Sequence, residues 1–443
     1  MTEPKLTLTE RLSYGLGDLG FSLAYNMASG FLLLYYVNVV KLPATAVGTI
    51  FLVARLLDAV IDVLVGIAVD KTRTRWGRTR PYFLFTAVPY ALIFVAVFSV
   101  PDWGQNAQLV YAFLTFKALG ILMSIGAIPY TALMPMMTQD TTQRLKLSGM
   151  RSVGTSISVV LGTAAVLPLA EAFGGKDLGK GFFGVAMVFA AIGLVAVLAL
   201  FRNCRERHVD NAPPSSAIMP FVREMLRNRA WWVAFGFCLF YFVRFGAMMA
   251  NTPFFAVEVL RQPWMISVML PAVSGALLLS AFIGPPIFAR MGIRKGCAAV
   301  LTLALAIFMV LPLTEANPAL FLALYVTMCL ATSVTITAAF TMIAETVDYH
   351  DWIFASRNEG LLSAGISLAT KLGMAAGTAA IAYGLGMAGY QSDAVSDAAR
   401  GAIRWSYYGW PIAMLALQIV CVWFWPMDGQ HDRIRADIAA RSA

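Results

Sequence analysis

Long apolar runs recur along the whole chain and restrict it to one class of fold. We count about twelve runs of about 18 to 30 residues, and about 20 apolar residues suffice for a helix to cross a bilayer. Only 13% of the residues are charged, against about 25% in soluble domains. Because a bilayer offers backbone groups no water, such spans form helices. We therefore predict an all-α membrane protein with twelve transmembrane helices, at about 14–39, 45–69, 82–101, 107–136, 147–170, 181–201, 231–257, 265–288, 297–314, 318–344, 361–387 and 405–426.

The 33 Lys and Arg residues are distributed unevenly along this pattern. With both termini placed in the cytoplasm, 22 fall on the cytoplasmic side, 6 on the opposite side and 5 within spans. Cytoplasmic loops of membrane proteins carry such an excess. The net charge of +9 therefore reflects topology, and we expect no nucleic-acid partner. The polar start, Met1–Glu10, predicts insertion by the first span without a cleaved signal.

The second span carries three charged residues, Arg55, Asp58 and Asp62. Residues three or four apart share one helix face, so the carboxylates stack one turn apart beside the arginine. Two carboxylates at membrane depth need a cation, a shared proton or an arginine to offset their repulsion. We interpret the pair as an ion site. A structural Arg55–Asp58 ion pair that leaves Asp62 protonated is the alternative.

Four further basic residues fall within predicted spans: Lys117, Arg151, Arg244 and Lys371. Each must face the bundle interior or a wet cavity, and we expect the second-span aspartates as counter-charges. Lys117 adjoins an aromatic stripe and could snorkel instead. A charge network at mid-depth would let ion and solute binding bias which side is open. Static neutralisation is the alternative.

Two glycine- and arginine-rich stretches lie about half a chain apart. Gly66–Pro81 follows the second span, and a degenerate copy, Gly284–Lys295, follows the eighth. Their matching positions indicate two six-helix halves related by duplication. The first stretch resembles the loop signature of the major facilitator superfamily, which implies that its aspartate and arginines latch neighbouring helices at the cytoplasmic side.

The loop at 344–360 is the most acidic stretch of the chain. It can pair with the loop arginines in one state and release them in another; a solvated charged loop is the alternative. The expected latch residues are Asp70, Arg73, Arg75, Arg78, Glu345, Asp348 and Arg357.

The longest polar segment, 202–230, separates the two halves. Apolar residues recur there at helical spacing with arginines opposite, which predicts a short amphipathic helix on the inner membrane surface. We expect six-helix bundles at 1–201 and 231–426, the linker 202–230 and a cytoplasmic tail at 427–443.

The residues that carry enzyme chemistry are scarce. The three histidines lie outside the spans, and the five cysteines pair at no motif spacing. Metalloprotease, nucleophile-elbow and phosphate-loop motifs are absent from the sequence. We therefore expect no enzyme, no cofactor, no disulfide framework and no metal centre.

Several stretches together resemble the glycoside–pentoside–hexuronide family of melibiose-permease-like symporters. This resemblance implies the major facilitator fold and symport of a proton or sodium ion with a sugar, glycoside or uronide by alternating access. It also implies an inner-membrane protein whose partners are a small solute, a cation and the bilayer, and we expect it to act as a monomer. The matching stretches are Ser13–Gly20, Phe51–Asp62, Thr72–Arg78, Ile128–Tyr130, Ala344–Tyr349, Ser356–Glu359, Lys371, Gly389–Tyr390 and Gly401–Arg404.

The resemblance also assigns roles to single residues. Asp58 and Asp62 match the two aspartates that hold the cation. Ser124 matches a hydroxyl position near the cation, and Lys371 matches a lysine beside it. Arg151 matches the arginine of the sugar site. A bound sodium ion, where present, is therefore expected at Asp58 and Asp62.

Five positions depart from the melibiose permeases. Ser22 and Ala127 replace aspartates, Thr131 and Ile336 replace tryptophans, and Ile61 replaces an asparagine. Fewer carboxylates beside an intact arginine suit an anionic solute such as a uronide, or a more apolar one. A lysophospholipid or another amphiphile is the alternative solute, because some members that the chain resembles also lack the fourth-span aspartate and carry lysophospholipids. Sodium prefers several oxygen ligands, so these losses favour a proton, with sodium as the alternative. The expected solute site is Asp18, Ser22, Ala127, Thr131, Arg151 and Ile336.

Overall fold

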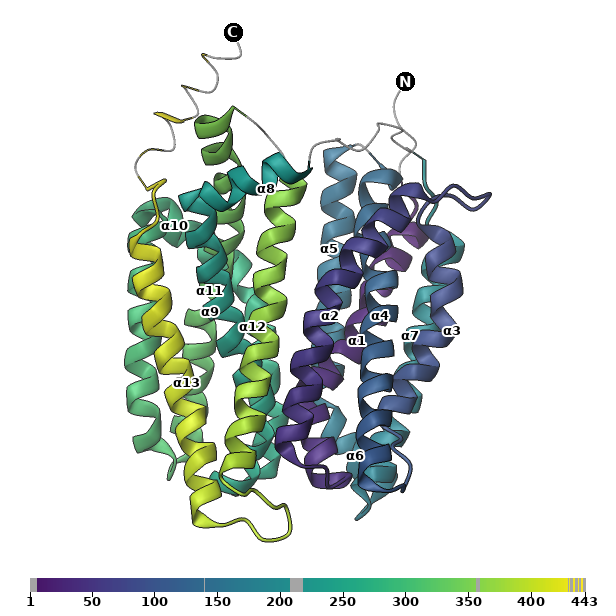
Figure 1. Cartoon of the computed structure of the whole chain (residues 1–443), viewed down its shortest axis with the longest axis vertical. Coiled ribbons are helices and arrows are strands. Elements are labelled where there is room, and N and C mark those ends of the chain that lie inside the picture. The colour runs from purple at the N-terminus through teal and green to yellow at the C-terminus, as the bar shows by residue number, and fades with distance from the viewer. Residues whose placement is uncertain are drawn as a thin grey trace. The chain divides into compact units, whose positions relative to one another are not determined.

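A computed structural model describes residues 6–138, 140–207, 218–355, 359–428, 430, 433–434, 437 and 440. The regular elements in these residues are all helical (Figure 1), which confirms the predicted all-α class. They form two compact units. Unit 1 comprises Met1–Asn211, Gln262–Pro271 and Ala382–Ala399, and unit 2 comprises Ala212–Arg261, Ala272–Ile381 and Arg400–Ala443.

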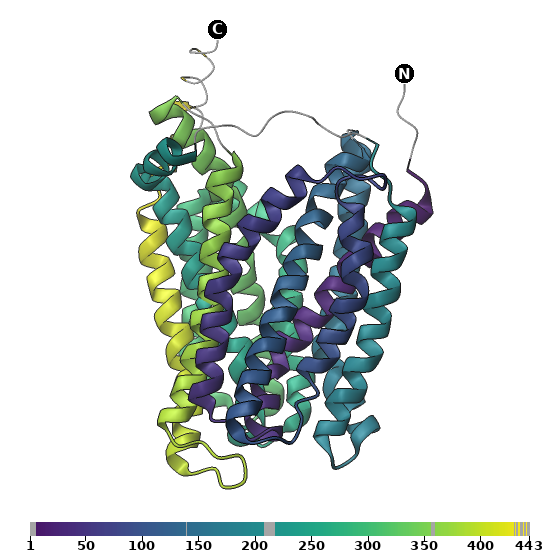
Figure 2. The same cartoon turned by 45° about the vertical axis from the view of Figure 1, so that its right-hand side comes forward.

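The long helices of unit 1 run alongside one another in both views (Figures 1 and 2). Its first 211 residues supply α1 (Leu8–Leu34), η1 (Tyr35–Val39), α2 (Ala44–Lys71), α3 (Arg80–Val97), α4 (Gln105–Met137), α5 (Thr141–Val159), η2 (Val160–Ala164), α6 (Val166–Gly174) and α7 (Leu178–Asn203).

The remaining helices belong mainly to unit 2, although η4, the start of α10, the end of α12 and the start of α13 fall in unit 1. They are α8 (Ile218–Arg227), α9 (Arg229–Phe254), η3 (Phe255–Val259), η4 (Pro263–Met265), α10 (Ile266–Val310), η5 (Leu311–Thr314), α11 (Pro318–Phe354), α12 (Glu359–Met387) and α13 (Asp397–Trp423).

Each of the twelve predicted apolar runs lies mostly on helices of the described chain, although the runs at 82–101 and 405–426 extend three or four residues past the ends of α3 and α13. α10 covers two of the runs, and Gly292 in its middle has a non-helical backbone with φ of +73°. Within the described residues, eight helices are long and apolar enough to cross a membrane, and a bent pair, Lys146–Ala164 with Val166–Gly174, adds a ninth. These spans agree with the predicted polytopic membrane protein.

Two local structural features, a π-helical turn and a close helix crossing at a glycine, recur in both units, as expected of duplicated halves. The π-helical turn η1 follows α1, and the π-helical turn η3 follows α9. Gly154 of α5 lets α1 approach, because a Cβ there would lie 2.1 Å from the Gly15 carbonyl oxygen. Gly377 of α12 does the same for α9, where a Cβ would lie 2.1 Å from the Val243 carbonyl oxygen. Small residues at such crossings let membrane helices pack by their backbones.

The first helix starts at a well-formed cap. The Thr7 hydroxyl accepts from the Glu10 N–H at 3.2 Å, and the Glu10 carboxylate accepts from the Thr7 N–H at 2.8 Å. This capping box satisfies two amides that the helix leaves without partners. Glu10 also accepts from Arg207 Nη2 at 2.6 Å, so the start of α1 is tied to the segment after α7.

Candidate functional site

A buried carboxylate lies between α2 and α4 of unit 1. Asp58 and Lys117 are only 5% and 8% exposed, and the Lys117 ammonium nitrogen lies 2.5 Å from Asp58 Oδ1. The same ammonium donates to the Ala54 carbonyl oxygen at 3.1 Å. Gly120 makes room for the carboxylate, because a Cβ there would lie 2.9 Å from Asp58 Oδ1. The ion pair therefore depends on this glycine as well as on the two charges.

A second cation approaches Asp58 from its own helix. Arg55 Nη1 lies 3.8 Å from Asp58 Oδ2, and the guanidinium lies 5.8 Å from the ring centres of both Tyr25 and Phe116. A cavity of about 20 Å³ adjoins these side chains, which is about enough for one water molecule. The Arg55–Asp58 contact is thus present, but the contact with Lys117 is shorter.

Three other residues were expected at the cation site. Asp62 is half-buried one turn further along α2, and Ser124 is half-buried on α4, seven residues after Lys117. Lys371 is half-buried on α12, in unit 2. The structure therefore assembles Asp58 with Lys117 within unit 1, and the roles of the three others stay predictions.

A second buried carboxylate joins α1 to α5. Asp18 is 6% exposed and accepts from Arg151 Nε at 3.0 Å and from Thr155 Oγ1 at 2.5 Å. Ser22, one turn along α1, donates its hydroxyl to Asp18 Oδ2 at 3.3 Å. Gly154, between the two α5 partners in the sequence, permits the close crossing that brings them within reach.

Asp18 binds the Nε atom of Arg151, and the outer part of the guanidinium remains accessible. The guanidinium lies 5.2 Å over the ring centre of Tyr130, which stacks on the Tyr14 ring at 4.7 Å. The side chain stays 39% exposed, and among the described residues its two terminal nitrogens donate to no acceptor. An arginine oriented in this way can bind a planar oxyanion with two parallel hydrogen bonds.

The other expected solute-site residues are spread over both units. Thr131 is exposed on α4, and its hydroxyl donates to the Ala127 carbonyl oxygen of the same helix at 3.1 Å. Ile336 is buried on α11, in unit 2. Thr155 and Tyr130 were not predicted as solute-site residues from the sequence. The spacing of four residues between Arg151 and Thr155, which places them on one helix face, was the available signal.

Arg244 of unit 2 is buried on α9, and its contacts among the described residues are to uncharged side chains. It is 3% exposed on α9, its guanidinium lies 5.0 Å over the Tyr241 ring centre, and Nη1 lies 3.8 Å from Met248 Sδ. Among the described residues, no carboxylate lies within ion-pair distance of it. The structure also pairs Arg151 with Asp18 rather than with the second-span aspartates.

The loop after α2 is anchored by an acid that the sequence analysis missed. The Glu206 carboxylate accepts from the backbone amides of Arg78 at 2.8 and 2.9 Å and of Thr79 at 2.6 Å. Gly77 beside it has φ of +107°, a backbone conformation that only glycine adopts readily. The acid and the glycine together shape this turn.

Unit 2 repeats the anchor at its own loop. Gly292 has φ of +73°, and Asp428 accepts from the Arg294 backbone amide at 3.4 Å. Arg294 Nη2 donates to the Trp425 carbonyl oxygen at 2.5 Å. In both halves an acid that follows the last long helix therefore binds the glycine–arginine loop.

Three of the expected latch arginines make contacts with their own loop or with the end of α2. Arg73 donates to the Thr72 carbonyl oxygen at 3.0 Å, and Arg78 Nε donates to the Val69 carbonyl oxygen at 3.1 Å. Arg75 lies 4.4 Å over the Trp76 ring centre.

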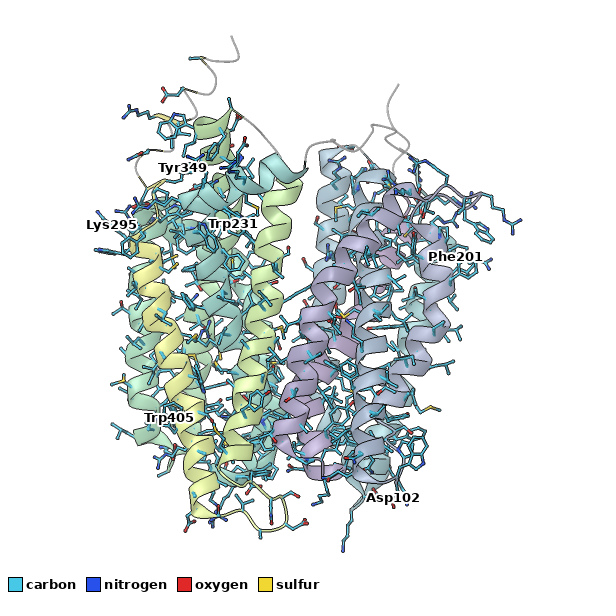
Figure 3. All side chains as sticks on the ribbon, viewed as in Figure 1. Asp102, Phe201, Trp231, Lys295, Tyr349 and Trp405 are labelled. Carbon is cyan, nitrogen blue, oxygen red and sulfur yellow. The ribbon has the colours of Figure 1, made fainter. Side chains whose placement is uncertain are left out.

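The neighbouring Arg80 donates to the carbonyl oxygen of Phe201, labelled in Figure 3, at 2.7 Å. Glu345 and Asp348 are half-buried on α11 of unit 2. The Asp70 side chain and Arg357 lie outside the described residues. The latch stays a prediction.

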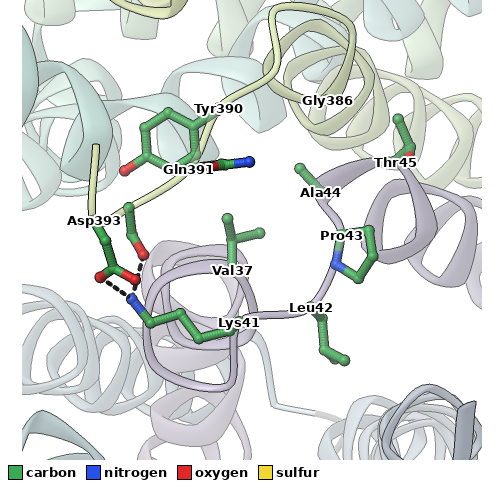
Figure 4. A pocket seen from close by; sticks show the side chains of 11 residues that line it. Val37, Lys41, Leu42, Pro43, Ala44, Thr45, Gly386, Tyr390, Gln391 and Asp393 are labelled. Atoms are coloured by element: carbon green, nitrogen blue, oxygen red, sulfur yellow. Dashed lines mark hydrogen bonds and ion pairs between the residues drawn. The ribbon is translucent and has the colours of Figure 1, made fainter. Parts of the chain in front are cut away.

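A cavity of about 420 Å³ opens where α2 begins, lined by residues of unit 1 (Figure 4). The Lys41 ammonium lies 2.5 Å from Asp393 Oδ1 and also bonds to Ser392. Asn38 donates to the Tyr390 hydroxyl at 3.1 Å. The side chains of Lys41 and Asp393 are 49% and 84% exposed, so solvent screens their attraction. Asp18 and Asp58, the buried carboxylates of the predicted solute and cation sites, are not among the residues that line this cavity.

Comparison with known proteins places this chain in a family of transporters. The chain matches the family described as MFS/sugar transport protein over residues 13–429. It is 31% identical over 400 residues to the inner membrane symporter YicJ of Escherichia coli (strain K12), covering 88% of this chain and 85% of that protein. It is 30% identical over 444 residues to the isoprimeverose transporter of Lactiplantibacillus pentosus, covering 98% and 92%.

A third relative is the glucuronide carrier protein homolog of Escherichia coli (strain K12), 30% identical over 439 residues that cover 97% of this chain and 95% of that protein. Among solved structures, the fold is similar to that of a D-xylose-proton symporter, with a TM-score of 0.64 and 15% identity over 93% of this chain and 96% of that chain. At this identity the likeness concerns the fold alone.

Proposed function

The chain belongs to the MFS/sugar transport protein family, and from that premise we propose that it moves a sugar, glycoside or uronide across the membrane together with a monovalent cation. It is an integral membrane transporter and not an enzyme. Relatives that match nearly the whole chain are named as an isoprimeverose transporter and as a homolog of a glucuronide carrier. A sugar-type solute is therefore the class that the comparisons support best.

The observation that carries the proposal is the arrangement of Arg151 on Asp18. The carboxylate holds Nε at 3.0 Å, while the terminal nitrogens stay available on a side chain that is 39% exposed. Such a fork suits the carboxylate of a uronide, and it can also donate to the hydroxyls of a neutral sugar. We propose that Ser22, Ala127, Thr131 and Ile336 complete this solute site.

The Asp58 region is proposed as the cation site. Asp58 is a buried carboxylate within a predicted span, and Asp62 follows one helical turn later. Charged groups at membrane depth commonly mark an ion pathway. In the proposal Ser124 and Lys371 act near these aspartates. Binding of cation and solute then biases the equilibrium between inward- and outward-open states.

The remaining features of the proposal concern topology and assembly. Both termini face the cytoplasm, as the distribution of Lys and Arg indicates. The loop arginines, with Glu345 and Asp348, form a latch on that side. The protein works as a monomer.

Uptake into proteoliposomes tests the function. We expect accumulation of a radiolabelled glucuronide or xyloside when a proton or sodium gradient is imposed, and none in its absence. Asp62→Asn should abolish gradient-driven accumulation while the protein still inserts. If no gradient drives uptake of any glycoside but a lysophospholipid moves, the solute class is wrong.

A further inference from the structure

Asp58 already holds a cation that belongs to the protein itself. The Lys117 ammonium lies 2.5 Å from Asp58 Oδ1 and 3.1 Å from the Ala54 carbonyl oxygen. Both acceptors are hard oxygen atoms of the kind that bind alkali and alkaline-earth ions. The side chains of Asp58 and Lys117 are 7% and 10% exposed, so water screens their attraction little.

A sodium ion fits poorly beside this carboxylate. Hard cations need several oxygen ligands at short distance, and here the ammonium occupies two of the nearest oxygens. On the other side of the carboxylate, Arg55 Nη1 lies 3.8 Å from Oδ2. The adjoining cavity measures about 20 Å³. A sodium ion there would face two fixed positive charges, whose repulsion is strong in a protein interior.

The geometry of α4 explains why Lys117 reaches the Asp58 carboxylate. Lys117 and Gly120 are three residues apart on α4, so they share one helix face. The glycine admits the Asp58 carboxylate, since a Cβ there would lie 2.9 Å from Oδ1. The lysine then reaches the carboxylate from the same helix. One face of α4 thus supplies both the space and the charge.

We propose that Lys117 determines the cation specificity of this transporter: its ammonium occupies the place at Asp58 where sodium would bind, and so excludes sodium. The inference rests on the proposed function, in which Asp58 belongs to the cation site. It predicts solute transport that does not depend on sodium, and it predicts that sodium binding appears when the ammonium is removed.

Sodium binding to the purified full-length protein tests the inference without any solute. The thermal unfolding midpoint is measured in NaCl and in choline chloride at equal ionic strength, and bound radiolabelled sodium is counted after equilibrium dialysis. Wild type should show no sodium-dependent shift and no saturable binding. Lys117→Ser frees the space and supplies an oxygen, so sodium should raise its midpoint by at least about 2 °C and bind saturably.

Lys117→Arg is the matched control, because it keeps a cation at the same position and should not respond to sodium. If Lys117→Ser does not fold, the longer amide side chain of Lys117→Gln repeats the test. Saturable sodium binding to wild type would overturn the inference, as would a folded serine or glutamine variant that gains none. Neither outcome contradicts the proposed symport. That proposal is contradicted only if no gradient drives sugar uptake.

Discussion

Arg151 of α5 and Asp18 of α1 lie 3.0 Å apart, Nε to Oδ1, across a helix crossing that Gly154 makes possible. The carboxylate is buried, whereas the arginine remains partly exposed. The pair therefore fixes the orientation of the guanidinium and leaves its terminal nitrogens to a ligand. In the proposed function, the accessible nitrogens of this arginine bind the solute while Asp18 fixes the orientation of the side chain.

Arg151→Lys should weaken the binding of acidic sugars selectively. Lysine keeps the positive charge near Asp18 but loses the planar fork that binds a carboxylate with two hydrogen bonds. Hydrogen bonds to charged groups contribute about 1.5–3 kcal/mol, so we expect the affinity for a glucuronide to fall about 10- to 100-fold. Ligand-induced thermal stabilisation measures the change.

The matched comparison for this variant is a neutral xyloside. The affinity for the xyloside should fall by a smaller factor, because hydrogen bonds to hydroxyl groups do not require the planar pair of guanidinium nitrogens. Equal losses for the two sugars would show that Arg151 supports the fold of the site without contacting the solute carboxylate.

Asp58→Asn should destabilise the protein because it leaves the Lys117 ammonium buried without its carboxylate. Removing one partner of a buried ion pair costs about 3–5 kcal/mol. We expect a lower midpoint of thermal unfolding for the single variant. The double variant Asp58→Asn/Lys117→Leu should recover most of that loss, since no buried charge is left alone. A single variant as stable as wild type would contradict the ion pair seen between α2 and α4.

Gly154→Ala should reduce solute binding although alanine favours helix formation by about 0.5–1 kcal/mol over glycine. The new Cβ would lie 2.1 Å from the Gly15 carbonyl oxygen, so α1 and α5 must separate and Asp18 must move away from Arg151. Gly149→Ala on the same helix is the control, because no atom lies within 4 Å of a Cβ there. The two variants are compared by solute titration, and equal affinities would show that the crossing tolerates a methyl group.

Glu206→Ala should release the loop between α2 and α3. The lost carboxylate accepts from the Arg78 and Thr79 amides, and each charge-assisted bond contributes about 1.5–3 kcal/mol. Trypsin should therefore cut within residues 71–80 at least about tenfold faster, because local opening becomes easier.

Two further variants complete that experiment. Asp428→Ala removes the equivalent acid of unit 2 and should expose residues 290–295 in the same way. Asp102→Ala, at an exposed acid between α3 and α4, should change neither digestion pattern. Unchanged cleavage in Glu206→Ala would mean that the loop is held by its arginines alone.

The membrane class, the helical spans and the duplicated halves were predictable from the sequence. Apolar length is a local property, and a repeated loop pattern such as Gly66–Pro81 can be recognised without knowing any contact. The charged residues can be recognised in the same way. An ionisable residue in an apolar run costs free energy wherever the helix packs, and this criterion selects Asp18, Asp58, Lys117 and Arg151.

Which of these charges meet was decided only by the tertiary structure. The pairing of charged side chains depends on the rotation of each helix about its axis and on how closely two backbones approach. Neither property can be predicted from a local sequence pattern. Gly154 lets Arg151 reach Asp18, and Gly120 lets Lys117 reach Asp58. The charged residues can therefore be identified from the sequence, whereas packing at two glycines determines which of them meet.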